Sequence, residues 1–121
     1  MNKVILITGA SSGIGKDTAL SLIKEGHLVY GAARRLEMMQ DIIQAGGHAI
    51  KMDILKERDI DEVVNQITKE QNRIDVLINN AGYGLWGAVE TISIAEAKRQ
   101  FDVNIFGLAY LTKKIIPLMR K

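Results

Sequence analysis

The segment Thr8-Gly9-Ala10-Ser11-Ser12-Gly13-Ile14-Gly15 decides the fold of this chain. It follows the apolar run Val4-Ile5-Leu6-Ile7, which predicts a short buried strand, and it precedes a helix predicted over Lys16–Glu25. A strand, a glycine turn and a helix N-terminus together favour the phosphates of a dinucleotide. We expect Gly9 to permit the turn, Gly13 to let the backbone approach the pyrophosphate, and Gly15 to let the helix pack closely. An ordinary strand-to-helix loop is the alternative for such a pattern taken alone.

Composition limits the class of protein. A chain of 121 residues with 47% hydrophobic and 25% charged residues is predicted to form one globular domain over residues 1–121. The net charge of +2, without a dense basic run, argues against nucleic acid as a partner. There is no cysteine, and the only histidines, His27 and His48, each begin a predicted strand, so we predict no metal site. No apolar run has transmembrane length and no secretory pattern is present, so a cytoplasmic protein without a membrane partner is the default expectation.

Strand-like apolar runs alternate with helical patterns along the whole chain. The strands are predicted at 4–7, 28–33, 49–52 and 74–78; later helices are predicted at 36–45, from Asp59 onward, and from Ser93 to about Arg120. This alternation predicts an α/β fold of right-handed βαβ units with a parallel sheet. The order expected for a sheet of the Rossmann type is 3-2-1-4. Such a sheet is about one half of a Rossmann-type doubly wound domain.

Helix ends and faces can be predicted as well. Gly26 and the pair Gly46-Gly47 suit helix C-termini, while Asp59 with Glu62, and Ser93 with Glu96, match capping boxes. Pro117 is expected to bend the last turn of the final helix. That helix has an apolar stripe, which either core burial or a subunit interface explains. The stripe consists of Phe101, Ile105, Leu108, Leu111, Ile115 and Leu118.

Four features, spread over nearly the whole chain, resemble the classical short-chain dehydrogenase/reductase family. They are the glycine turn, Asp53 after the third predicted strand, Asn79-Asn80-Ala81-Gly82 after the fourth, and Asn104 in the last helix. The glycine turn is moderately specific by itself, and it is strong when joined to the Asn-Asn-Ala-Gly sequence. The resemblance covers the N-terminal part of the family's fold. It implies hydride transfer between a nicotinamide cofactor and a carbonyl or alcohol carbon.

Several residues are predicted to contact this cofactor. Ser11, Ser12 and Ile14 lie where backbone N–H groups and hydroxyls can meet phosphate oxygens at the positive end of a helix. Asp53 follows a strand, at the end where α/β sheets bind ligands, and its carboxylate can accept from an adenine amino group. We assign Ile54, the next residue, to the same part of the site. The alternative for Asp53 is a side chain that only caps a turn.

The Asn-Asn-Ala-Gly sequence receives its roles from the resemblance. Asn80, Ala81 and Gly82 are implied to pass beside the cofactor ribose, while Asn79 is expected to tie neighbouring strands together. The resemblance also implies that Asn104 joins the catalytic network through water. A structural amide is the alternative for Asn104, and the two roles are compatible.

The end of the second predicted strand bears on the choice between NAD and NADP. An enzyme that uses NAD usually places an acidic residue there, whereas this chain has Ala33 followed by Arg34 and Arg35. An arginine can bind a 2′-phosphate through paired charge-assisted hydrogen bonds. We therefore predict NADP, with Arg34 as the main contact and Arg35 as its support. A solvated turn is the alternative, and Ser12 stands where some NADP-preferring relatives carry a basic residue.

The remaining catalytic groups are implied by the resemblance alone. A serine and a Tyr-x-x-x-Lys pair are expected on a fifth strand and the following helix, beyond residue 121. Tyr110 and Lys114 have the required spacing, but they lie on the same helix as Asn104, only six residues after it, so we exclude them. The 121 residues alone are therefore expected to bind cofactor weakly and not to turn over.

Two expectations concern substrate and assembly. The aromatic loop at 83–87, which contains Trp86, favours an apolar or bulky carbonyl or alcohol substrate; packing of Trp86 under the loop is the alternative. In a polypeptide of these 121 residues alone, the fourth strand, with Val76-Leu77-Ile78, is predicted to be an open sheet edge, which favours marginal stability, a homo-oligomer or aggregation; the alternative is that the residues belong to a longer enzyme. The leading hypothesis is the cofactor half of an NADP-dependent oxidoreductase. The alternatives are a non-catalytic dinucleotide-binding module, completed by a partner chain or a second copy, and a remnant without function.

Overall fold

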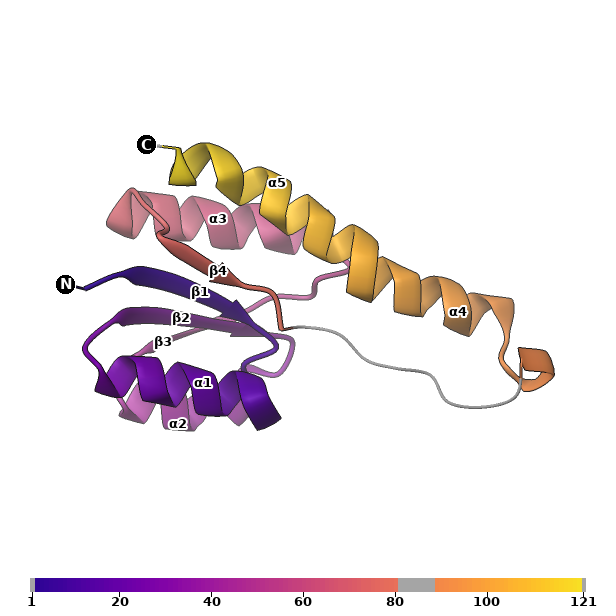
Figure 1. The fold of residues 1–121 in the computed structure, drawn as a ribbon, viewed down its shortest axis with the longest axis horizontal. Helices are drawn as coiled ribbons and strands as arrows, with labels where there is room; N and C mark the ends of the chain where they lie inside the picture. Colours follow the sequence, from indigo (N-terminus) through magenta and orange to yellow (C-terminus); the bar gives the residue numbers. More distant parts are fainter. Residues whose placement is uncertain (1, 81–88, 121) are drawn as a thin grey trace.

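The computed structural model describes residues 2–80 and 89–120, which form one sheet covered by helices (Figure 1). The four strands are parallel and lie in the order β3-β2-β1-β4, as the sequence predicts. Their bounds are Val4–Thr8 for β1, Leu28–Ala33 for β2, His48–Lys51 for β3 and Val76–Ile78 for β4. The helices are α1 (Gly13–Lys24), α2 (Gln40–Gln44), α3 (Glu57–Gln71), α4 (Ile94–Phe101) and α5 (Leu108–Met119), with 3₁₀ turns at Leu36–Met39 and Val89–Thr91.

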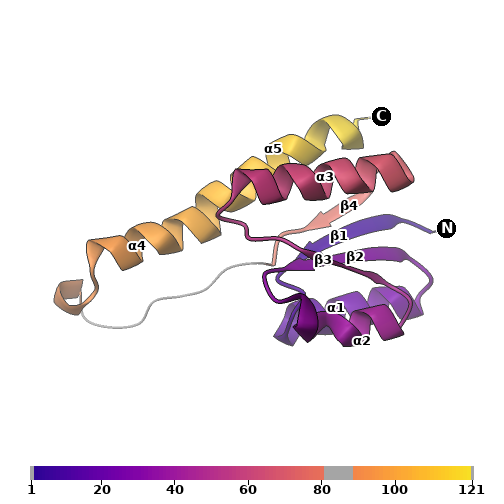
Figure 2. The same ribbon diagram turned by 180° about the vertical axis from the view of Figure 1, so that it is seen from behind.

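Both faces of the sheet are covered, because β1 directs apolar side chains to both sides. Val4 and Leu6 belong to the cluster beneath α3 and α5, whereas Ile5 and Ile7 belong to the cluster beneath α1 and α2. Figures 1 and 2 show the two helix layers on opposite sides of the strands. A strand buried on both faces needs an unbroken apolar run rather than an alternating one. This explains why Val4–Thr8 is uniformly buried.

Several predicted element bounds differ from the observed ones. The first helix begins at Gly13 rather than Lys16, and the fourth strand begins at Val76 rather than Ile74. The helix predicted over 36–45 divides into a 3₁₀ turn and the short α2. Gly26 and Gly46 have φ angles of +94° and +100°, so the predicted glycine C-termini of α1 and α2 are confirmed.

The capping box predicted at Asp59 and Glu62 is wrong. For the one predicted at Ser93 and Glu96, the bond to the Ser93 hydroxyl is confirmed. Helix α3 begins at Glu57 after the N-cap Lys56, so Asp59 lies inside the first turn. The Asp59 carboxylate instead accepts a hydrogen bond from the backbone N–H of Asp53, at 2.9 Å. Ser93 does cap α4, since its hydroxyl accepts from the N–H of Glu96 at 3.0 Å.

The final helix is interrupted by a π-helix over Asp102–Gly107, which joins α4 to α5. The C-terminal part of its predicted stripe is buried, because Leu111, Ile115 and Leu118 pack into the core. The N-terminal part is not, since Phe101 and Ile105 are 55% and 48% exposed. Both views show the reason: α4 projects beyond the sheet (Figures 1 and 2).

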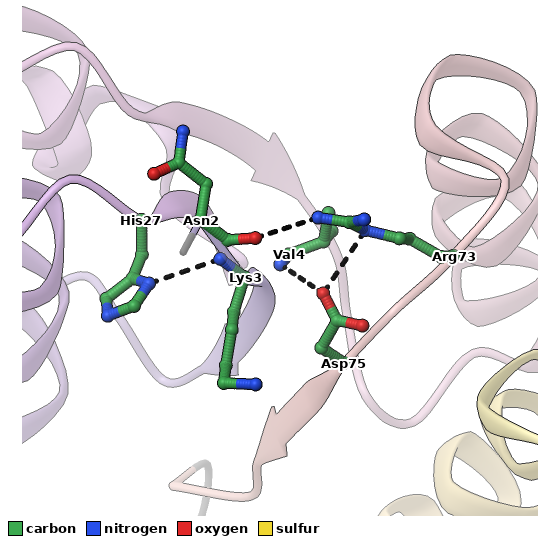
Figure 3. Close-up of polar contacts among 6 residues, drawn as sticks. All are labelled: Asn2, Lys3, Val4, His27, Arg73 and Asp75. Atoms are coloured by element: carbon green, nitrogen blue, oxygen red, sulfur yellow. Dashed lines mark hydrogen bonds and ion pairs between the residues drawn. The ribbon is translucent and has the colours of Figure 1, made fainter.

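The amino ends of the strands are fastened by a polar network (Figure 3). The Asp75 carboxylate accepts from the N–H of Val4 at 2.7 Å and pairs with Arg73 at 3.2 Å. The N–H of Asp75 donates in return to the carbonyl of Val4, at 2.8 Å. Nδ1 of His27 accepts from the N–H of Lys3 at 3.2 Å. Both strands that flank β1 are thus tied to its first residues.

Replacing Asp75 tests this network. We expect Asp75→Ala to lower the free energy of unfolding by about 1–3 kcal/mol, because the Val4 N–H loses its acceptor. Asp75→Asn keeps an oxygen acceptor and should cost less. Urea unfolding of the wild-type protein and both variants measures the difference. Equal losses in the two variants would show that the hydrogen bond to Val4 is not what the carboxylate contributes.

The other histidine also has a structural role. The ring of His48 stacks on that of Tyr30, with centroids 4.6 Å apart. The Tyr30 hydroxyl donates to Glu70 at 2.7 Å. Burial of the ring, followed by the bond to Glu70, raises the pKa of Tyr30 above its usual value.

Candidate dinucleotide site

A cavity of about 360 Å³ lies at the carboxyl ends of the strands, the end to which the arrowheads in Figure 1 point. Open α/β sheets bind their ligands at this end. Segments that follow all four strands contribute to its wall, together with the π-helix and α4. The lining residues are Thr8, Gly9, Ser11, Ser12, Ala32, Ala33, Arg34, Met52, Asp53, Ile54, Leu55, Asn80, Arg99 and Val103.

The glycine turn leaves the N-terminus of α1 open to an anion. Gly9 and Gly13 have φ angles of +67° and +58°, a region that favours glycine. A Cβ on Gly13 would meet no atom within 4 Å, so the space beside the turn is empty. The N-cap Ser12 makes no side-chain capping bond, and the first turn of α1 contains no acidic residue. The donor groups and the free space therefore fit a phosphate.

Gly15 is required by a close approach of three chain segments. A Cβ on this residue would lie 2.3 Å from the carbonyl oxygen of Gly9 and 2.4 Å from Nδ2 of Asn80. The Asn80 amide donates to that same carbonyl, at 3.2 Å, and the Asn80 N–H donates to Thr8 Oγ1, at 3.0 Å. Asn80 thus links the chain after β4 to the glycine turn, and Gly15 leaves room for that link.

Asp53 caps a turn, which was the structural alternative for this residue. Its carboxylate accepts from the N–H of Leu55 at 3.0 Å, and its carbonyl accepts from the N–H of Lys56 at 2.9 Å. The residue nevertheless lines the cavity. Ile54 lines it as well and packs against the π-helix, since a Cβ on Gly107 would lie 2.7 Å from the Ile54 carbonyl oxygen.

The two arginines after β2 are placed differently. Arg34 directly follows the end of β2 and lines the cavity, whereas Arg35 is the N-cap of the 3₁₀ turn and is not among the lining residues. Both side chains are exposed. An arginine at the cavity wall can meet an anionic group on the ligand, so the geometry favours Arg34 over Arg35 for that role.

The cavity does not include every residue assigned from the sequence. Ile14 is 78% exposed, and Gly13, Gly15 and Asn104 do not line the cavity either. Asn104 lies in the π-helix. Three further positions, Ala81, Gly82 and Trp86, lie outside the described residues.

The predicted role of Asn79 is wrong. Its side-chain amide donates to Thr112 Oγ1 of α5, at 3.2 Å, and the Thr112 hydroxyl donates to the carbonyl of Leu108. Asn79 therefore ties the end of β4 to a covering helix rather than to a neighbouring strand. The partner, Thr112, lies 33 positions later in the chain, so this contact could not be read from the local sequence.

Arg99 and Val103 line the cavity and were not identified from the sequence. They are four residues apart, a spacing that places two side chains on one side of a helix. This spacing, next to Asn104, was the only available indication. The π-helix had no comparable pattern, although Gly107 inside a predicted helix marked an irregular position.

The Tyr110 and Lys114 pair faces α3. The Tyr110 hydroxyl donates to Asp61 at 3.0 Å, and Lys114 lies 3.5 Å from the same carboxylate. Desolvation of the ring, followed by the bond to Asp61, raises the pKa of Tyr110 above its usual value. A tyrosine that gives up a proton near neutral pH needs the opposite shift. This supports the exclusion of the pair from catalysis.

Within residues 2–80 and 89–120, no group of three or more histidines and carboxylates is arranged to hold a metal ion. None of the helices described is both long and apolar enough to cross a membrane.

The sheet, the glycine turn and the cavity define a dinucleotide-binding protein of the Rossmann type. A profile of the short chain dehydrogenase family matches residues 3–121. The chain therefore belongs to this family of oxidoreductases, which bind a nicotinamide dinucleotide.

Known proteins agree with this assignment. The 3-ketodihydrosphingosine reductase of Bacteroides thetaiotaomicron is 41% identical over 119 residues, which are 98% of this chain and 43% of the relative. The structure of a variant of actinorhodin polyketide ketoreductase with NADPH superposes with a TM-score of 0.89 at 29% identity, covering 98% of this chain and 48% of that one. An NADH-dependent reductase complexed with NAD gives a TM-score of 0.84 at 34% identity, covering 98% and 52%. The chain thus spans about half the length of the relatives it matches.

Proposed function

We propose that residues 1–121 are the cofactor-binding part of an NADP-dependent oxidoreductase that interconverts a carbonyl and an alcohol. The observation that carries the proposal is the cavity itself. It brings the glycine turn after β1, Arg34 after β2 and Asp53 after β3 to one wall. When bound, the cofactor supplies the hydride donor or acceptor.

The chain's own residues would hold this cofactor in a defined order. The N–H groups of the glycine turn and of α1 receive the pyrophosphate, with the Ser11 and Ser12 hydroxyls beside them. The Asn80 side-chain amide holds the turn in place through its hydrogen bond to the Gly9 carbonyl oxygen. Ile54 gives an apolar surface after β3. We also propose that Asn80, Ala81 and Gly82 lie beside the cofactor ribose.

The preference for NADP depends on charge at the end of β2. Ala33 stands where an acid would repel a 2′-phosphate, and Arg34 lines the cavity beside it. No ion pair of Arg34 with a carboxylate is found in the described parts of the chain, so its charge is available to a ligand. Arg35, which is also exposed, can add to the local potential without lining the cavity.

Other parts of the proposal extend to the whole protein. Asn104 is proposed to join the catalytic network, and the substrate is proposed to be an apolar or bulky small-molecule carbonyl or alcohol. A homo-oligomer is proposed because members of this family are typically oligomeric. We further propose a cytoplasmic protein without nucleic-acid or membrane partners.

The test uses the full-length protein with NADPH and NADH. Isothermal titration should give a clearly lower Kd for NADPH than for NADH. Loss of reduced-nicotinamide absorbance with a panel of apolar ketones and aldehydes should then show turnover. Binding without turnover on any substrate would favour a dinucleotide-binding module, and absence of binding would reject the proposal.

Removing the Tyr110 hydroxyl tests its exclusion from catalysis. Because this hydroxyl is bound to Asp61, Tyr110→Phe in the full-length enzyme should leave the catalytic efficiency within about twofold of wild type. Steady-state kinetics measures this, with Thr112→Ala as a matched control on the same helix. If the turnover rate instead fell by about two orders of magnitude, as it does when a general acid–base group is removed, Tyr110 would belong to the reaction.

A further inference from the structure

Arg99 is a cation on the wall of the candidate site that the sequence motifs do not assign to the cofactor. It extends from α4 and lines the cavity together with Val103 of the π-helix. The same residue, with Ile54 and Leu55, also borders a second cavity of about 720 Å³, which is lined by residues of α3, α4, the π-helix and α5. Arg99 therefore lies beside the turn that follows β3.

The strand order shows which part of a dinucleotide this position would meet. The glycine turn follows β1, Arg34 follows β2, and the turn containing Ile54 follows β3. These strands are consecutive neighbours in the sheet, so the three segments lie in sequence along its carboxyl edge. A dinucleotide with its pyrophosphate at the first segment and its adenosine ribose at the second places its base at the third. Arg99 stands at the third.

On the side of the first cavity, the surroundings of Arg99 suit a flat, uncharged ring. Ile54 and Val103 are buried and apolar, and the carboxylate on the cavity wall, that of Asp53, already accepts from Leu55. The guanidinium makes no ion pair or side-chain hydrogen bond with any other residue in the described part of the chain. A guanidinium without a carboxylate partner can lie flat on an aromatic ring.

We propose that Arg99 packs its guanidinium against the adenine ring of the bound cofactor and closes the outer side of the adenine subsite. The inference rests on the proposed function, because it requires a dinucleotide in the cavity. Arg99 then contributes equally to the binding of cofactors with and without a 2′-phosphate. Arg34, by contrast, contributes to the binding of NADPH and not of NADH.

The test measures the binding of three probes to the full-length protein by isothermal titration: NADPH, NADH and ADP-ribose. All three contain adenine, and ADP-ribose lacks the nicotinamide. Arg99→Ala should raise the Kd of each by a similar factor, about 3- to 30-fold for one cation–π contact. Arg99 is exposed, so its removal should not disturb folding, and thermal unfolding of the variant checks this.

Lys98→Ala is the matched control, since Lys98 is the adjacent cation on α4 and lines the second cavity but not the first. It should leave all three Kd values unchanged. A loss confined to NADPH would assign Arg99 to the 2′-phosphate and overturn the proposal, as would no loss for any probe. Failure of the wild-type protein to bind all three would instead reject the proposed function.

Discussion

Gly15→Ala should abolish measurable binding of NADPH, with a Kd raised by more than about 100-fold. The added methyl group would lie 2.3 Å from the Gly9 carbonyl oxygen and 2.4 Å from the Asn80 amide. Neither is the end of a flexible side chain free to move, since Asn80 is bound to Gly9 and its N–H is bound to Thr8. The turn must shift, and two charge-assisted backbone bonds to phosphate, each contributing about 1.5–3 kcal/mol, would be lost.

Overpacking should also lower the free energy of unfolding, by about 1–3 kcal/mol. Gly46→Ala is the control that separates a loss of stability from a loss of affinity for NADPH. Gly46 has a positive φ, of +100°, in which an alanine is strained, whereas a Cβ there would meet nothing within 4 Å; Gly46 lies at the end of α2 and does not line the cavity. We expect it to lose stability and keep its affinity for NADPH, in parallel urea unfolding and titration experiments. If Gly15→Ala bound NADPH nearly as well as wild type, the three-way contact at this glycine would not control the site.

Arg34→Ala should weaken NADPH binding by about 10- to 100-fold and leave NADH binding within about twofold. The difference between the two cofactors is one phosphate. Charge-assisted hydrogen bonds from a guanidinium to that phosphate contribute about 1.5–3 kcal/mol, which corresponds to this range. The variant should therefore approach equal affinity for both cofactors. Titration of each into the full-length variant measures the ratio directly.

Arg35→Ala is the control, because Arg35 has the same charge and is adjacent in sequence but does not line the cavity. Its expected effect on NADPH is a few-fold at most, through long-range potential that added salt would screen. Equal losses of NADPH and NADH affinity in Arg34→Ala would contradict the NADP assignment. A larger loss in Arg35→Ala would reverse the roles of the two arginines.

The sheet was predictable because its determinants are local. A doubly buried strand such as β1 needs an unbroken apolar run, and a helix that packs on it ends where Gly26 can adopt a positive φ. The glycine turn was predictable because an apolar strand precedes it and a helix follows it, a context that the glycine spacing alone does not supply. The strand order 3-2-1-4 was expected from the Rossmann type that the glycine turn indicates, because right-handed βαβ connections alone permit other orders as well.

What could not be predicted depends on contacts between distant segments. Asn79 donates to Thr112, 33 positions later, and Asp59 turns back to the N–H of Asp53 instead of capping its own helix. Arg99 of α4 lines the cavity together with residues that follow the strands far earlier in the chain. None of these partners can be chosen from spacing alone, because many polar residues satisfy the same local pattern.

The π-helix at Asp102–Gly107 also explains why the predicted apolar stripe failed halfway along the last helix. A regular α-helix turns about 100° per residue, and a π-turn accommodates an additional residue within one turn. The segment therefore changes which side chains of α4 share a face with those of α5. A relative that lacked one residue here would rotate α4 about its own axis while α5 stayed seated on the core. It would present a different side chain to the cavity than Arg99. Single-residue length differences in this segment are thus a means by which relatives with the same sheet can alter the wall of the site.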